Sequence, residues 1–316
     1  MKIVRANHLG MCFGVRDAID LAKRTAAQTP VTVLGQLVHN EHVLADLKQH
    51  GVSFANEPAE AKTATVMITA HGASDKRLAS TRSAGHQVIE ATCPLVHQAH
   101  RELRMLLMAG YHPVIIGMPD HVEVLGMTED LASFDVVETR ANVDQLTGHR
   151  KLGIVAQTTQ PIDRVNELVA AIRDRFPQSD VLFMDTVCRP TKDRQTAAID
   201  LAKQCAVVVV IGGSNSNNTH ELVATCTKFC KRVHRITSAG ELVNSWFKKE
   251  DIVGLTAGTS TPDWIVESVE TALKEMDPSP ENDNPSTNAT APNPVPLVIR
   301  NTNQPAPKQS AMVAMS

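Results

Sequence analysis

Three cysteines occupy the same place in a repeating pattern of the sequence. They are Cys12, Cys93 and Cys188. Each follows a short apolar run that is typical of a strand, and each precedes a segment with helical periodicity. The next apolar run then ends in a glycine, at nearly equal spacings from the three cysteines, namely at Gly35, Gly117 and Gly212. A buried cysteine by itself usually packs as a small hydrophobe, but that interpretation does not explain a shared position.

Three thiolates without a fourth are suited to two kinds of metal chemistry. One is a catalytic zinc ion that keeps an open coordination position. The other is an iron-sulfur cluster in which one iron lacks a protein thiolate. The spacing of the cysteines does not choose between these two sites.

The elements that must position the cysteines form three tandem βαβ-type units, which predicts an α/β fold with mostly parallel sheets. We expect units at 13–94, 95–189 and 190–276, with residues 1–12 contributing an N-terminal strand to the core. Open α/β sheets bind ligands at the carboxyl ends of their strands. If the three units meet around an axis, the three cysteines meet with them.

Composition is consistent with an enzyme-sized, water-soluble chain. The 316 residues are 42% hydrophobic and carry a net charge of −3, which gives no reason to expect nucleic acid or a membrane as partner. No apolar stretch reaches the roughly 18 residues that span a bilayer. We therefore expect a cytoplasmic protein, whose cysteines are thiols or metal ligands. Residues 277–316 are rich in Pro, Asn, Ser and Thr, which predicts a disordered tail.

Two sets of loops in the repeat contain groups that hold anions. Histidines, hydroxyls and amides beside helix N-termini form a natural site for a phosphate or diphosphate. The candidates are His39, His71, His121, Thr158, Thr159, Ser216, Asn217, Asn218, Thr259 and Ser260. Glu123 lies two residues after His121 and would be an unusual phosphate ligand, so proton transfer is the better interpretation. Cys226 and Cys230, four apart on a predicted helix, are interpreted as packed thiols.

The motifs that contain these residues resemble the 4-hydroxy-3-methylbut-2-enyl diphosphate reductase family, the LytB type. The resemblance runs in order from Met1 to about Met276. It rests on Gly10-Met11-Cys12-Phe13-Gly14-Val15, Val38-His39-Asn40, Ala70-His71-Gly72, Ala91-Thr92-Cys93-Pro94-Leu95, His121-Val122-Glu123-Val124, Gln157-Thr158-Thr159, Asp185-Thr186-Val187-Cys188 and Thr256-Ala257-Gly258-Thr259-Ser260-Thr261-Pro262.

The resemblance implies a pseudo-threefold trefoil around one 4Fe-4S cluster per chain, held by Cys12, Cys93 and Cys188. It also implies that a diphosphate is bound by His39, His71, His121, Ser216, Asn217, Asn218 and Ser260. Glu123 would donate protons, with help from His121, and Thr158 would orient the substrate hydroxyl. The implied reaction is a two-electron reductive dehydroxylation that gives isopentenyl and dimethylallyl diphosphates. Because no nucleotide fingerprint is present, electrons would come from a ferredoxin or flavodoxin type donor.

The sequence departs from the family pattern at three places near the predicted site. After Cys188, Arg189-Pro190-Thr191 replaces the more usual residues, although Arg194-Gln195 is kept. The loop Ser214-Asn215-Ser216-Asn217-Asn218 begins without the usual lysine and has Asn217 where a serine is usual, which predicts a weaker grip on diphosphate. Val122 stands where proline is usual, which loosens the turn before Glu123. The predicted cluster ligands are all intact.

Three alternatives remain open from the sequence. An enzyme of the quinolinate synthase type also arranges three such units around a three-cysteine 4Fe-4S cluster. A non-catalytic iron-sulfur sensor would have no need for Glu123. A zinc protein would be colourless and would stay active in air.

Overall fold

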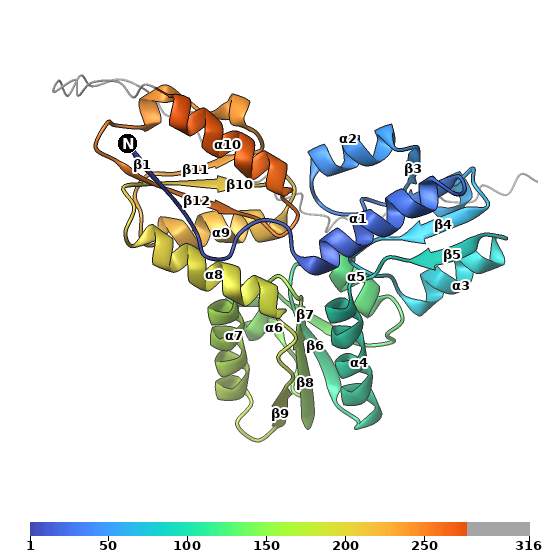
Figure 1. The fold of residues 1–316 in the computed structure, drawn as a ribbon. Helices are drawn as coiled ribbons and strands as arrows, with labels where there is room; N and C mark the ends of the chain where they lie inside the picture. The colour runs from blue at the N-terminus through green and yellow to red at the C-terminus, as the bar shows by residue number, and fades with distance from the viewer. Residues whose placement is uncertain (277–316) are drawn as a thin grey trace, which may run out of the picture. The chain divides into compact units, whose positions relative to one another are not determined.

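The computed structural model describes residues 1–276, so the predicted tail at 277–316 lies outside the described residues. The described chain forms three separate sheets, each with four strands, and every strand pair in them is parallel (Figure 1). Helices separate successive strands, as parallel pairing requires. The predicted α/β class is confirmed.

The first sheet has the strand order β3-β2-β4-β5. Its strands are β2 (Val31–Leu34), β3 (Val52–Ala55), β4 (Thr65–Ile68) and β5 (Gln87–Glu90). The helices that accompany them are α1 (Phe13–Ala26), α2 (Glu41–Gln49), the 3-10 turn η1 (Pro58–Glu60) and α3 (Asp75–Ser83). Helices α1 and α2 pack on one face through Ala18, Ala22 and Leu47, and Leu78 of α3 packs on the other.

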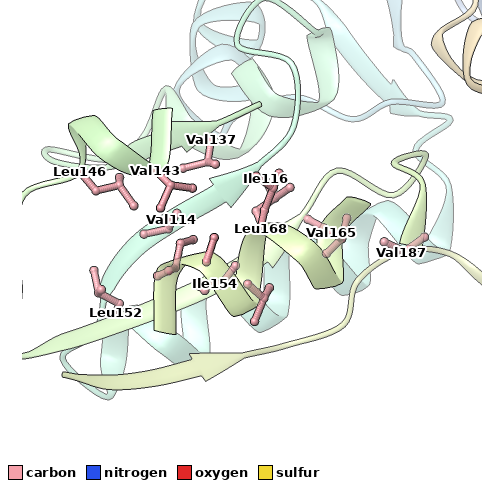
Figure 2. Close-up of a cluster of buried hydrophobic side chains, with 14 residues drawn as sticks. Val114, Ile116, Val137, Val143, Leu146, Leu152, Ile154, Val165, Leu168 and Val187 are labelled. Atoms are coloured by element: carbon pink, nitrogen blue, oxygen red, sulfur yellow. The ribbon is translucent and has the colours of Figure 1, made fainter. Parts of the chain in front are cut away.

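The second sheet has the order β7-β6-β8-β9. Its strands are β6 (His112–Ile116), β7 (Asp135–Val137), β8 (Lys151–Ala156) and β9 (Asp180–Phe183). The helices of this part are α4 (Pro94–Met108), α5 (Val122–Thr128), α6 (Arg140–Gln145) and α7 (Ile162–Arg175). Because side chains alternate along a strand, Ile116 and Ile154 face α7 whereas Ile115 and Val155 face α4. Figure 2 shows the α7 side of this core.

The third sheet joins the two ends of the described chain, in the order β1-β12-β10-β11. Its strands are β1 (Lys2–Arg5), β10 (Val207–Ile211), β11 (Val233–Ile236) and β12 (Ile252–Ala257). Helices α8 (Arg189–Ala202), α9 (Asn217–Thr227) and α10 (Asp263–Glu275) and the turns η2 (Ala239–Glu241) and η3 (Asn244–Trp246) complete it. All five residues of β10 are buried, as expected of a β-branched run covered on both faces.

The sheets draw their strands from the segments 31–90, 112–183 and 207–257, with β1 added to the last. The exact bounds of the three predicted units stay a prediction. Cys226 and Cys230 are both buried in the core between α8, α9 and the third sheet, but Cys230 lies beyond the end of α9 rather than on it. Over residues 1–276, no helix combines the length and the apolar character needed to cross a membrane.

Close packing between β12 and α8 depends on Gly254. A Cβ atom at this position would lie 2.8 Å from Leu201 Cγ and 2.9 Å from Cys205 Sγ. We expect Gly254→Ala to lower the free energy of unfolding by about 1–3 kcal/mol, because the core must shift to admit a methyl group. Gly240→Ala is the matched control, since the nearest atom there is 3.9 Å away. Chemical denaturation of both variants measures the difference, and equal stability would contradict this account of the packing.

Candidate functional site

Each of the three predicted cysteines occupies the N-cap position of a helix. Cys12 precedes α1, Cys93 precedes α4 and Cys188 precedes α8. None of the three side chains makes a capping hydrogen bond, so each sulfur is left for another partner. The positive end of a helix dipole favours an anion at this position. The three helix starts therefore favour thiolates or an anionic group bound to them.

Equivalent hydrogen bonds fix the backbone of the three cysteines. The amide N–H groups of Cys12, Cys93 and Cys188 donate to the carbonyl oxygens of Thr259, Ala70 and Thr158, each at 3.0 Å. These acceptors lie in the loops that contain the predicted Ser260, His71 and Thr158. The backbone of each cysteine is thus hydrogen-bonded to a loop that contains a predicted ligand.

The three cysteine side chains line one cavity together with Glu123 and Thr158. All three are partly buried and form no disulfide. Burial raises the pKa of Cys188 to about 11 and also raises that of Cys93. At neutral pH Cys93 and Cys188 are therefore thiols, and binding a metal would deprotonate them.

The spacing of the sulfur atoms distinguishes between kinds of metal group. Among residues 1–276, only His112, Asp135 and His149 bring three metal-ligating atoms within 4.8 Å of one another. The cysteine sulfurs are therefore spread more widely, whereas ligands on one tetrahedral zinc would lie about 3.8 Å apart. The thiols fit a group of several atoms better than a single ion. His112 forms a hydrogen bond with Asp135 at 2.8 Å and stacks on His149. These contacts explain why the three side chains lie close together.

Glu123 lies beside the thiols and is almost fully buried. The Thr158 N–H donates to its Oε1 at 2.7 Å, and the Thr158 hydroxyl donates to its Oε2 at 3.0 Å. Burial nevertheless raises the pKa of Glu123 to about 7, against the lowering effect of these two hydrogen bonds. A carboxyl group with this pKa can give or take a proton near neutral pH.

Three histidines from different loops meet next to this cavity. The His39 and His71 rings stack with centroids 4.4 Å apart, and His121 approaches their edges at 5.4 and 5.6 Å. Burial lowers the pKa of all three, that of His121 to about 4. The His121 Nδ1 accepts a hydrogen bond from the Glu123 N–H at 3.1 Å, which leaves Nε2 as its N–H donor. The cluster is neutral until an anion enters.

The predicted serine and asparagine ligands line a second, polar cavity together with these histidines. Ser216 caps α9 by accepting from the Thr219 N–H. Asn218 Oδ1 accepts from the Thr259 N–H at 3.0 Å, and the Ser260 hydroxyl donates to the His39 carbonyl oxygen at 3.1 Å. Both His71 Nδ1 and Asn218 Nδ2 are buried without a hydrogen-bond partner. Buried polar atoms are normally satisfied, so these two atoms are available to hydrogen-bond a ligand.

The polar cavity adjoins the thiol cavity. The polar cavity is lined by all of the predicted diphosphate ligands, namely His39, His71, His121, Ser216, Asn217, Asn218 and Ser260. Val15, His71, Thr159 and Thr259 line both cavities. A small anion held by the polar side chains would therefore place its far end beside the thiols and Glu123.

The comparisons with known proteins agree with this geometry. The family model described as "LytB protein" matches residues 3–274. The chain belongs to the LytB family. Two LytB relatives are each 36% identical to it and are named 4-hydroxy-3-methylbut-2-enyl diphosphate reductase. The protein from Trichlorobacter lovleyi aligns over 88% of this chain and 100% of its own length. The protein from Aquifex aeolicus aligns over 87% and 97%.

Solved structures of LytB reductases share the fold. The E-1-hydroxy-2-methyl-but-2-enyl-4-diphosphate reductase from Plasmodium falciparum superposes with a TM-score of 0.82 at 26% identity, over 91% of this chain and 93% of that one. A second structure is described as (E)-4-hydroxy-3-methyl-but-2-enyl diphosphate reductase, the terminal enzyme of the non-mevalonate pathway. Its TM-score is 0.65 at 36% identity, over 87% of this chain and 99% of that one.

Two residues of this LytB site, Thr191 and Arg194, were not assigned a role from the sequence. The Thr191 hydroxyl lies 3.0 Å from Cys188 Sγ, and its position three residues further along α8 is a signal that could have found it. Arg194 is buried near Cys12 and Cys188, and no sequence pattern predicted its burial. Thr259, which was among the predicted candidates, lines both cavities.

The raised pKa of Glu123 predicts a pH-dependent cost to stability. Between pH 4.5 and about 7 the unfolded chain loses this proton while the folded chain keeps it, so stability falls as pH rises through that range. Glu123→Gln removes the titration and preserves the shape of the group. The free energy of unfolding of the variant minus that of the wild type should therefore increase by up to about 3 kcal/mol between pH 4.5 and pH 8. Urea unfolding across this pH range measures the gain, and a constant difference would contradict the raised pKa.

Proposed function

We propose that this chain is a 4-hydroxy-3-methylbut-2-enyl diphosphate reductase. The reaction would take two electrons and two protons, remove the allylic hydroxyl as water and yield isopentenyl or dimethylallyl diphosphate. The observation that carries the proposal is the polar cavity of three neutral histidines, a serine pair and two asparagines beside a three-thiol cavity. The family and the names of the relatives support it.

We infer that Cys12, Cys93 and Cys188 hold one 4Fe-4S cluster, with the three units arranged around it as a pseudo-threefold trefoil. Three thiols at helix N-cap positions, spread too widely for one ion and lining one cavity, fit such a group. When bound, the cluster would supply electrons and, at the iron without a cysteine, a Lewis acid for the hydroxyl oxygen.

In this proposal the polar cavity binds the diphosphate. The ligands would be His39, His71, His121, Ser216, Asn217, Asn218 and Ser260. The unpaired Nδ1 of His71 and Nδ2 of Asn218 offer hydrogen-bonding atoms at no further desolvation cost. An anionic group would also raise the lowered pKa values of the histidines, because it stabilises their charged forms. Substrate binding would then be accompanied by proton uptake.

Glu123 and Thr158 would act at the hydroxyl group of the substrate, where the protons are transferred. With its pKa raised to about 7, Glu123 retains a proton below neutral pH and can give it to the leaving hydroxide. The Thr158 hydroxyl bonds the same carboxyl group and can turn toward the substrate hydroxyl, which would orient it. His121 is tied to the Glu123 backbone and would either bind the diphosphate or aid protonation.

The electron donor would be a one-electron carrier of the ferredoxin or flavodoxin type, because no sequence fingerprint for a resident nicotinamide or flavin is present. We also propose that the chain is cytoplasmic and that its three units are divided after residues 94 and 189. The quinolinate synthase alternative loses its support, since the match to the LytB family covers nearly the whole described chain.

Glu123→Gln tests the catalytic role of the carboxyl group. We expect turnover of 4-hydroxy-3-methylbut-2-enyl diphosphate to fall by about 100- to 10,000-fold, because an amide cannot donate the required proton. An anaerobic assay with a reduced viologen dye, with products identified by mass spectrometry, measures the rate.

Iron content must be measured in the same samples, and it should match the wild type. Glu167→Gln, on the exposed face of α7, is the control and should leave the rate unchanged. Full activity of Glu123→Gln would refute the proton-donor role. If the wild type holds the cluster without turning over this substrate, the non-catalytic sensor remains as the better account.

The Asn217 departure predicts a specific change in substrate affinity. Asn217 lines the polar cavity and donates weakly to Thr159 Oγ1 at 3.5 Å. Asn217→Ser introduces the hydroxyl that the family pattern has at this place. We expect KM to fall several-fold with kcat nearly unchanged, since a hydrogen bond to the distant diphosphate adds binding in ground state and transition state alike. A KM equal to or above that of the wild type would contradict this role of the loop.

A further inference from the structure

Arg194 is a buried arginine that links the loops of two predicted cluster ligands. It lies on α8, six residues after Cys188, and is 8% exposed. Its Nε donates to the carbonyl oxygen of Gly10, two residues before Cys12, at 2.9 Å. Its guanidinium also donates to the Pro190 carbonyl oxygen at 2.9 Å. The side chain therefore bridges the Cys12 loop and the start of the Cys188 helix.

The charge of this guanidinium lacks a carboxylate partner among residues 1–276. Both acceptors of Arg194 are neutral backbone carbonyls. Asp193, next to it in sequence, forms its ion pair with Arg189 at 2.6 Å instead. A buried positive charge is costly unless an opposite charge compensates it, and arginine does not lose its proton in proteins. The surroundings of Arg194 must therefore supply negative charge from another source.

The two acceptors of Arg194 place it beside the Cys12 loop and the start of the Cys188 helix, so these two cysteines are the candidates. Burial lowers the pKa of Arg194, and thiolates at Cys12 and Cys188 would oppose that effect more strongly than Asp193 does. Metal coordination would make both cysteines thiolates. Three thiolates and a bound cluster would form a buried anionic group, and Arg194 is the cation whose hydrogen bonds lie next to two of the thiolates, Cys12 and Cys188.

We propose that Arg194 is a positioning residue that raises the reduction potential of the cluster by holding a permanent positive charge beside its Cys12 and Cys188 ligands. The inference rests on the proposed cluster but not on the identity of the substrate. Reduction adds one negative charge to the cluster, so a fixed cation nearby stabilises the reduced state more than the oxidised one. Because the guanidinium is buried, salt screens its effect only weakly.

Arg194→Gln tests this inference in anaerobically purified, cluster-loaded protein. We expect the ratio of reduced to oxidised cluster at a fixed potential to fall about tenfold, which is a shift of about 59 mV for one electron. A redox titration followed by electron paramagnetic resonance measures it. Arg194→Lys keeps the charge and should stay within threefold of the wild-type ratio.

Arg189→Gln is the matched control, because Arg189 directly follows Cys188 but is 83% exposed in its side chain. Its ratio should stay within threefold of the wild type at physiological salt. A glutamine variant with a full cluster and a ratio within threefold of the wild type would overturn the inference, as would an equal loss in Arg194→Lys. If the glutamine variant fails to retain iron, the lysine variant decides alone: a tenfold loss overturns the inference and an unchanged ratio supports it. Absence of iron from the wild type would instead refute the proposed cluster.

Discussion

The site depends on one repeated constraint, which is that each cysteine lies where a strand has ended and a helix begins. At that junction the cysteine N–H is bound by a carbonyl of a neighbouring loop, at 3.0 Å in all three cases. None of the three side chains makes a capping bond, and within residues 1–276 only the Cys188 sulfur contacts a nearby hydroxyl, that of Thr191. Since the strands in each sheet are parallel, the loops after them gather at one edge, and the cysteines and ligand loops gather there together.

The electrostatics of the two cavities follow from burial. Desolvation keeps the three histidines neutral and keeps a proton on Glu123 up to about pH 7. The same site therefore holds few full charges of its own, apart from buried Arg194. An anion that binds there would contact histidines that can become protonated, and it would lie near the Glu123 carboxyl group, which can still donate its proton. Binding and protonation are linked because the same loops carry both sets of residues.

Much of this arrangement could be predicted from the sequence because it repeats. The shared position of Cys12, Cys93 and Cys188 and the apolar runs around them indicated the parallel α/β units, and the sheets have that form. The predicted ligands from distant loops line two adjoining cavities. Spacing alone could not show that β1 pairs with β12, because strand pairing depends on tertiary contacts rather than on local pattern. For the same reason the burial of Arg194 and the contact of Thr191 with Cys188 were missed. Cys230 was placed on a helix that ends at Thr227, since helix ends depend on local geometry that periodicity does not define.

The central claim is that three cysteines, and no fourth protein ligand, hold a four-iron cluster. Iron Mössbauer spectroscopy of the anaerobically purified chain tests it most directly, because the method separates irons with different ligands. The account predicts one iron site distinct from the other three, and a change in that site alone when the diphosphate substrate is added. Four equivalent irons, or protein that holds zinc in place of iron, would contradict it.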